Sequence, residues 1–412
     1  MNRPICCKYR LLRLCLFLLL MLSLTGCSAH RDSRLRWVTY SETGAPLDAK
    51  EVIAAANAVS EEKIGVTVNL EFQPPDKINL MMASGEYYDI VFTCAWTNDF
   101  DKNAEAGLYY DITDLVQKET PALYESIGQY WDCATVNGRI IVIPYDQETE
   151  IPQAMALWDC EKVMDRYRTL HRWYKAGYIH PDAATIDSTA ADKSFPVRFG
   201  VAWKGYMGYS NPADWGFHVK TPTYEGPFIS RQSEQGAMFG ICAACSEERV
   251  IECLKYIELL STDRKFRDIL AYGIEGKHFE YLDNGTVLTT RTGADRYATR
   301  LYQTGSFVNA SVASISRDIL ADPDQWEKVF EEYDTEGIYS KTHGFHYSES
   351  RKESIITALQ AIFGDYSTEL RTGTSDPDVV IPKMRARMEA AGFDELLADV
   401  QDQINEWFAS GH

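Results

Sequence analysis

The sequence predicts an α/β fold in which an open, mainly parallel sheet carries helices on both faces. Residues 88–93 (YDIVFT) form a short apolar run of the kind that is buried in a parallel sheet. Strand and helix patterns alternate from residue 36 to this run, and a βαβαβ order favours helices on both faces of one sheet. From residue 247 onward the apolar residues recur at helical spacing, so the second half is expected to be rich in helix.

The first five elements are justified one by one by their sequence patterns. Strands are expected at 36–40, 65–72 and 88–93, and helices at 47–60 and 76–83. Apolar and polar residues alternate along the second strand, which is the period of a half-buried strand. Pro74 and Pro75 end that strand, and Asp76 can cap the helix that follows.

Later elements are predicted from the same signals. Asn137-Gly138 marks a turn, and the strand after it ends at Pro144, where the chain is expected to cross between two parts of the fold. Helices are expected at 159–176, 248–260, 263–271, 324–333, 377–391 and 394–408, and short strands at 199–203 and 239–242. No internal repeat or long low-complexity stretch interrupts this order.

The N-terminus has the order of a bacterial secretory signal. Four basic residues (Arg3, Lys8, Arg10 and Arg13) precede the uncharged run 14–24, which ends in LTGC at 24–27. A cysteine directly after Leu-Thr-Gly indicates a lipoprotein signal, so Cys27 is expected to carry the lipid and to become the new N-terminus. The run is too short for a membrane span, which needs about 20 apolar residues.

The charge of the chain excludes some partners. Residues 1–26 hold four basic and no acidic residues, so the remaining chain has 37 Lys and Arg against 60 Asp and Glu, a net charge of 37 − 60 = −23. Nucleic acid is not expected as a partner, because its binding depends on basic residues that neutralise phosphates. The 386 residues that remain suffice for two domains with their own cores.

Six cysteines follow Cys27, too few for a fold built on disulfides. Cys242 and Cys245 have the spacing of a thiol redox pair, but they lie in a predicted buried strand that turns toward a helix. Buried small residues are the preferred interpretation, and a structural disulfide stays open because the sequence does not pair the thiols.

Several segments resemble extracellular solute-binding lipoproteins of ABC importers, which are grouped as solute-binding protein family 1 of the carbohydrate type. The general resemblance lies in LTGC at 24–27, YDIVFT at 88–93 with Trp96 behind it, and GLYYDITDL at 107–115. A Gram-positive branch with its own C-terminal domain of unknown function is similar in further segments. These are WYKAGYIHPDA at 173–183, LSTD at 260–263, YGIEGKHFE at 272–280, Gly344-Phe345 and QDQINEW at 401–407.

The resemblance implies a two-lobe, type II periplasmic-binding-protein-like fold that closes on a ligand and delivers it to a membrane permease. It implies lobe 1 at 35–143 with part of 267–330, lobe 2 at 144–266, and a C-terminal helical region at 331–412 that packs on lobe 2. A signal peptide (1–26) and a tether (27–34) precede them. One departure stands out: family members carry a long segment where this chain has only residues 145–172, so lobe 2 is expected to be shortened.

Candidate ligand-binding residues are aromatic side chains at strand ends and the polar residues beside them. Sugar rings stack on flat aromatic faces while polar groups bind the hydroxyls. Trp96 is the strongest candidate, because it follows a buried strand at the edge where open sheets bind ligands. The full set is Trp96, Thr97, Asn98, Asp99, Tyr145, Glu148, Trp203, Tyr206 and Tyr347.

No motif for catalysis or metal binding is found. The sequence lacks a zinc-protease helix, and GYSNP at 208–212 has proline where a nucleophile elbow needs glycine. His343 and His346 could hold a metal, but two surface histidines are the preferred interpretation. We therefore expect no catalytic residue, no metal and no cofactor.

The expected function is that of a monomeric solute receptor, anchored through Cys27 to the outer face of the cell membrane. It captures a mono- or oligosaccharide and passes it to ABC permease subunits. Two alternatives stay open: a truncated paralogue that does not bind a ligand and, more remotely, a surface hydrolase.

Overall fold

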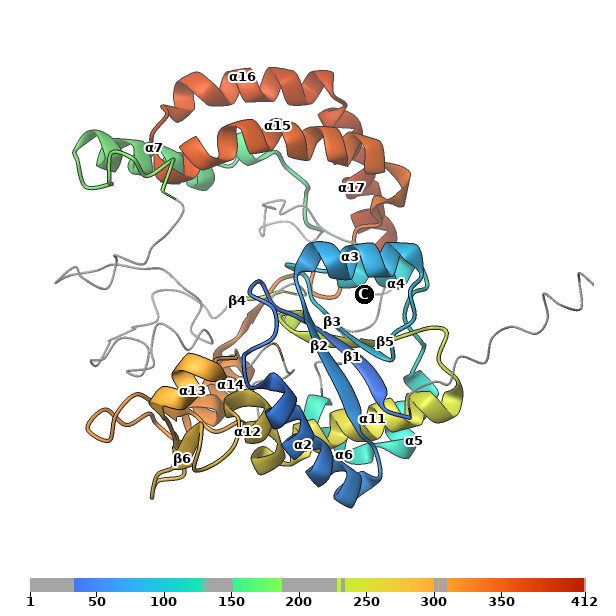
Figure 1. Cartoon of the computed structure of the whole chain (residues 1–412). Coiled ribbons are helices and arrows are strands. Elements are labelled where there is room, and N and C mark those ends of the chain that lie inside the picture. Colours follow the sequence, from blue (N-terminus) through green and yellow to red (C-terminus); the bar gives the residue numbers. More distant parts are fainter. Residues whose placement is uncertain are drawn as a thin grey trace, which may run out of the picture.

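The computed structural model describes residues 33–128, 131, 151–186, 228–230, 234–299, 303 and 310–410. Figure 1 shows a sheet with helices on both sides, and a separate group of helices formed by α7, α15, α16 and α17. We call the first part the sheet domain and the second the helical unit. Each has its own hydrophobic core.

The sheet domain begins with the βαβαβ order that the sequence predicts. Its first elements are β1 (Leu35–Tyr40), α2 (Ala49–Ile64), β2 (Val68–Gln73), α3 (Pro75–Ser84), β3 (Ile90–Thr93), α4 (Phe100–Glu105), α5 (Thr113–Glu119) and α6 (Pro121–Ile127). All four residues of β3 are buried, as expected for a strand covered on both faces. Pro75 occupies the first turn of α3, where its missing N–H costs nothing, and Gly85 ends that helix in the left-handed conformation.

The main sheet has the strand order β2-β1-β3-β5. β1 pairs in parallel with β2 and β3, and β5 (Met238–Ile241) is antiparallel to β3, with Thr93 opposite Met238. In Figure 1, α3 lies on one side of this sheet, and α2, α5, α6 and α11 (Glu247–Thr262) lie on the other. The predicted α/β class with helices on both faces is confirmed.

One domain boundary differs from the prediction. Residues 238–262 were expected in lobe 2, but β5 completes the main sheet, and Val250, Leu254 and Leu260 of α11 belong to its core. The reason is that the backbone of β5 completes its hydrogen bonds by pairing with β3, and its last two residues are buried in the core of this sheet. A division that ends lobe 2 at residue 266 is therefore wrong for this stretch.

The chain next adds elements around the sheet domain and then crosses to the helical unit. They are α12 (Arg264–Tyr272), β6 (Phe279–Tyr281), β7 (Val287–Thr289), α13 (Arg291–Arg296), β8 (Ala313–Ser314) and α14 (Gln325–Glu336). Strands β6, β7 and β8 form a separate small sheet. β9 (Ile338–Tyr339) follows α14 and pairs in parallel with β4 (Phe228–Ile229), which precedes the segment leading into β5.

The helical unit joins residues that are far apart in the sequence. It comprises η2 (Leu157–Asp159), α7 (Glu161–Lys175), η5 (Glu349–Arg351), α15 (Glu353–Thr372), α16 (Pro377–Ala390) and α17 (Phe393–Ala409). Met164 of α7 is buried with Leu359, Met384 and Val400 of the three C-terminal helices. Arg168 adds a two-pronged ion pair to Asp378 on α16. The C-terminal helices thus pack on residues that the sequence assigned to lobe 2.

The YGIEGKHFE segment forms a turn that holds the start of α2. His278 is fully buried, and its Nδ1 accepts a hydrogen bond from the backbone N–H of Ile274 at 2.9 Å. Its Nε2 therefore carries the proton and donates to Asp48 Oδ2 at 3.1 Å. Gly273 is required here because its φ is 100° and a Cβ would lie 2.5 Å from the His278 ring.

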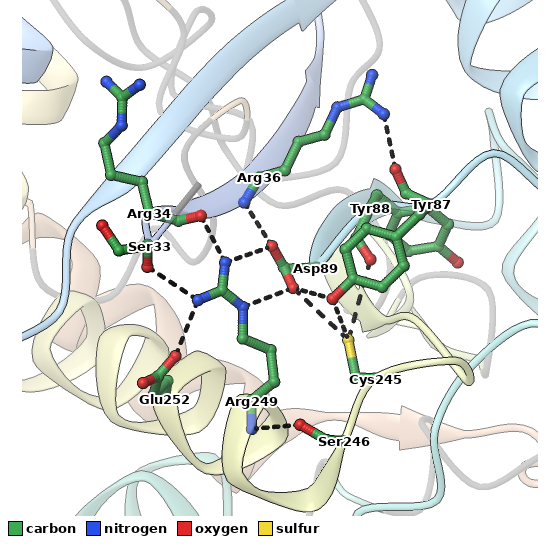
Figure 2. Close-up of polar contacts among 10 residues, drawn as sticks. All are labelled: Ser33, Arg34, Arg36, Tyr87, Tyr88, Asp89, Cys245, Ser246, Arg249 and Glu252. Carbon is green, nitrogen blue, oxygen red and sulfur yellow. Dashed lines mark hydrogen bonds and ion pairs between the residues drawn. The ribbon is translucent and has the colours of Figure 1, made fainter. Parts of the chain in front are cut away.

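A buried carboxylate, Asp89, ties three parts of the sheet domain together (Figure 2). Arg249 of α11 contacts both of its oxygens, at 2.9 and 3.0 Å, and the backbone N–H of Arg36 on β1 donates at 2.6 Å. Burial raises the pKa of Asp89, but Arg249 and the Tyr87 hydroxyl outweigh it, so the net shift is downward. A lowered pKa means that this stabilisation is present above the unfolded value, about pH 4, and is lost as pH falls through the folded value.

Five cysteines lie among the described residues, and all five are free thiols. The expectation that Cys242 and Cys245 are buried is confirmed. Cys245 lies 3.4 Å from the Tyr87 hydroxyl and 3.7 Å from Asp89, at the rim of the Asp89 cluster. Burial and these neighbours make the pair part of the packing around α11.

We expect Asp89→Ala to lower the free energy of unfolding by about 3 kcal/mol, because it leaves Arg249 without its buried partner. Urea denaturation at pH 7 measures the effect. The double variant Asp89→Ala/Arg249→Ala should lose less than the sum of the two single variants. Additive losses, or a loss below about 1 kcal/mol for Asp89→Ala, would contradict the assigned role.

Candidate ligand-binding site

Two segments meet at the carboxyl edge of β1 and β3. The loop 94–99 follows β3, and residues 234–237 precede β5, whose first residue pairs with the last residue of β3. The backbone N–H of Ala95 donates to the carbonyl of Gln235 at 3.0 Å, which joins the two segments directly. Ligands of open α/β sheets bind at this edge, so these segments define the candidate site.

Trp96 presents an exposed indole at this edge in a restrained orientation. The residue is 52% exposed, and its Nε1–H donates to the carbonyl of Gly236 at 2.7 Å. The Tyr40 ring meets it edge-on at 5.3 Å, and the Phe92 ring lies at 5.8 Å. An exposed aromatic side chain held by a hydrogen bond and two rings suits stacking against a flat ligand.

The backbone of the loop is held by the two residues that follow Thr97. Asn98 and Asp99 have positive φ values of 49° and 21°. The Asn98 amide donates to the carbonyl of Phe92 at 2.6 Å, and Thr93 Oγ1 donates to the carbonyl of Asn98 at 2.8 Å. Asp99 Oδ1 accepts from the backbone N–H of Lys102 and caps α4.

These contacts correct one prediction. Asn98 was expected to face the ligand site, but it is 3% exposed and its amide donates to the carbonyl of Phe92, so its side chain holds the loop backbone. Asp99 uses one oxygen as a helix cap, and Thr97 contacts the Cys94 thiol through its backbone. The roles of Thr97 and Asp99 toward a ligand stay predictions.

Tyr347 is a second correction. It was expected on a loop facing a ligand, but it is 1% exposed and belongs to the core of the helical unit, with its hydroxyl donating to Asp399 at 2.8 Å. The phenol is large and apolar enough to fill that core once its hydroxyl is satisfied. Four other candidates, Tyr145, Glu148, Trp203 and Tyr206, and the lipidation candidate Cys27 lie outside the described residues.

Polar side chains from three distant segments complete this edge, and sequence reasoning did not assign them to it. Gln235 is buried and donates to Asp101 Oδ1 at 3.2 Å. His343 Nε2 lies 2.9 Å from Glu234 Oε2. The His346 side chain is 5% exposed and lies 3.6 Å from Glu105, so the expectation of a surface histidine is wrong there. The HGFH spacing was the only sequence signal for this contact.

Within the part of the chain that the structure describes, no group of three or more His, Cys, Asp or Glu side chains is arranged to hold a metal ion. The carboxyl edge of β1 and β3 combines an exposed indole with carboxylate, amide and imidazole groups. Such groups bind hydroxyl-rich molecules through stacking and hydrogen bonds.

Comparison with known proteins relates the sequence to solute-binding proteins. Residues 341–409 match a family described as a domain of unknown function, DUF3502. The chain is a homologue of a carbohydrate ABC transporter substrate-binding protein of Streptococcus pneumoniae serotype 4 (strain ATCC BAA-334 / TIGR4). The two are 25% identical over 450 residues, which covers 88% of this chain and 89% of that protein. The resemblance noted in the sequence is thereby confirmed.

The aligned length of 450 exceeds the 412 residues of this chain, so the relative has segments without a counterpart here. The fold agrees with solved structures of the N-glycan transport solute binding protein (NgtS) from S. pneumoniae. One such structure has a TM-score of 0.76 at 20% identity, covering 92% of this chain and 100% of that one. Its complex with Man1GlcNAc has a TM-score of 0.72 at 20% identity, covering 90% and 98%. The predicted two-lobe solute-binding fold is confirmed.

We expect Asn98→Ala to lower the free energy of unfolding by about 2 kcal/mol. The carbonyl of Phe92 loses its hydrogen-bond donor, and the alanine must adopt a positive φ without the side-chain hydrogen bond that Asn98 makes there. Chemical denaturation followed by circular dichroism measures this. Asn98→Gly is the matched control, since it relieves the φ constraint and removes the same amide. A variant Asn98→Ala as stable as the wild type would show that the amide does not hold the loop.

Proposed function

We propose that the protein is the extracellular receptor of an ABC importer, and that it captures a carbohydrate at the carboxyl edge of the main sheet. The observation that carries this proposal is Trp96, a half-exposed indole held by Gly236, Tyr40 and Phe92 at the edge where such folds bind ligands. The relationship to a carbohydrate substrate-binding protein supports a sugar over other solutes.

The mechanism requires that two lobes approach each other around the ligand. The pairing of β4 with β9 brings together two segments that lead to and from the sheet domain, and short paired crossings are suited to hinge motion. Closure on the sugar would cover Trp96 and create the surface that a permease recognises. The protein itself changes no covalent bond in this mechanism.

Attachment to the membrane through lipid on Cys27 belongs to the proposal. Among the described residues, no helix has both the length and the apolar character that a membrane span requires. A diacylglyceryl group on Cys27 supplies two acyl chains, and two chains anchor a protein stably where one does not. The strong negative charge of the chain after residue 26 keeps the domain away from the anionic membrane surface.

We expect Cys27→Ala to release the protein from the membrane fraction into the medium of cells that express the full chain. Fractionation and immunoblotting measure the distribution, and Cys6→Ala, a cysteine inside the predicted signal, is the control. Retention of Cys27→Ala in the membrane fraction would contradict the lipid anchor.

The test of sugar binding is a thermal-shift screen of residues 28–412 against neutral oligosaccharides, amino acids and peptides. A ligand present at one hundred times its dissociation constant adds about 2.7 kcal/mol of stability. We expect a shift with oligosaccharides alone. A flat result from a folded protein would favour the truncated paralogue that the shortened segment after Tyr145 suggests.

We further expect Trp96→Ala to weaken the binding of the identified sugar at least tenfold, about 1.4 kcal/mol, because the stacking surface is lost. Isothermal titration calorimetry measures the change. Trp173→Ala is the matched control, since Trp173 is 50% exposed but lies on α7, and it should bind within twofold of wild type. Equal affinities of Trp96→Ala and wild type would remove Trp96 from the site.

A further inference from the structure

The crossing strands β4 and β9 expose large apolar side chains. Phe228 is 54% exposed, Ile338 is 47% exposed and Tyr339 is 42% exposed. Successive side chains of a strand point to opposite faces, so Ile338 and Tyr339 occupy different faces of β9. The face of Tyr339 also carries His343, whose ring meets the tyrosine ring at 5.0 Å and 87°.

A continuous series of contacts connects Tyr339 with Trp96. His343, in contact with Tyr339, pairs through Nε2 with Glu234 at 2.9 Å. Two residues after Glu234, the carbonyl of Gly236 accepts the hydrogen bond from Trp96. These contacts link Tyr339 to Trp96 through the His343–Glu234 pair and the backbone of Gly236.

The chemistry of the middle of this surface selects the kind of ligand. A carboxylate only accepts hydrogen bonds, so His343 Nε2–H donates to Glu234, and Nδ1 is the second polar atom of the ring, an acceptor in imidazole and a donor in imidazolium. No described residue bonds that Nδ1. A ligand hydroxyl both donates and accepts, so it can bond Nδ1 in either form of the ring, whereas a ligand carboxylate would meet the negative charge of Glu234 at close range.

We propose that Tyr339, His343 and Glu234 form a second subsite of the ligand-binding site, which takes one uncharged sugar ring of an oligosaccharide that also stacks on Trp96. Tyr339 provides the apolar face, and the His343–Glu234 pair forms hydrogen bonds with hydroxyls. This inference rests on the proposed function. It adds that the ligand is an oligosaccharide longer than a single ring, and that it is neutral.

The experiment measures the affinity of residues 28–412 for Man1GlcNAc and Man5GlcNAc, the sugars in the neighbouring structures, by isothermal titration calorimetry. We expect Tyr339→Ala to weaken Man5GlcNAc at least tenfold, and Tyr339→Phe, which keeps the ring, to stay within threefold of wild type. Ile338→Ala is the matched control on the opposite face of the same strand, and it should stay within twofold.

The charge is tested with Glu234→Gln and an acidic probe. A mannuronate oligosaccharide of comparable length should bind wild type at least tenfold more weakly than Man5GlcNAc. In Glu234→Gln the ratio of the two dissociation constants should fall at least threefold. Wild-type affinity in Tyr339→Ala, alongside a loss in Trp96→Ala, would overturn the second subsite and leave the proposed function intact. A wild-type protein that binds neither neutral sugar would overturn both.

Discussion

The arrangement of the sheet domain depends on one buried carboxylate. Asp89 lies directly before β3, and its oxygens are shared between Arg249 of α11 and the backbone of Arg36 on β1. Because a buried charge is tolerated only when it is paired, this residue fixes how β1, β3 and α11 sit against one another. The opposite ends of β1 and β3 carry Tyr40 and the loop of Trp96, so the geometry of the candidate site follows from that pairing.

The candidate site is built from segments that only the fold brings together. Loop 94–99, residues 234–237 and the turn around His343 are separated by more than a hundred residues at each step. Trp96 and Tyr339 remain exposed there, and exposed apolar side chains bordered by polar groups are typical of binding regions. The same turn leads from β9 into the helical unit, so movement of that unit would act on His343.

Local patterns predicted much of the fold. The strand–helix alternation before Thr93, the break at Pro74 and the helix after Ser246 appear in the structure because short-range preferences and burial agree there. Helix α15, the longest described, was missed, and α11 was assigned to the wrong lobe. Partner choice between distant elements leaves no periodic signal in one sequence.

Only part of the candidate site could be predicted, because contacts between distant segments leave no signal in the sequence. Trp96 could be found because a single strand and its loop place it, whereas Glu234 and His343 meet only through the β4–β9 crossing. Tyr347 had the same local sequence signals as a binding residue, but its ring is buried in the core of the helical unit and its hydroxyl bonds Asp399.

The most direct test of the account is a crystal structure of the protein with a neutral oligosaccharide. We predict a sugar ring parallel to the indole of Trp96, and a ligand bound elsewhere with Trp96 uncovered would contradict the account.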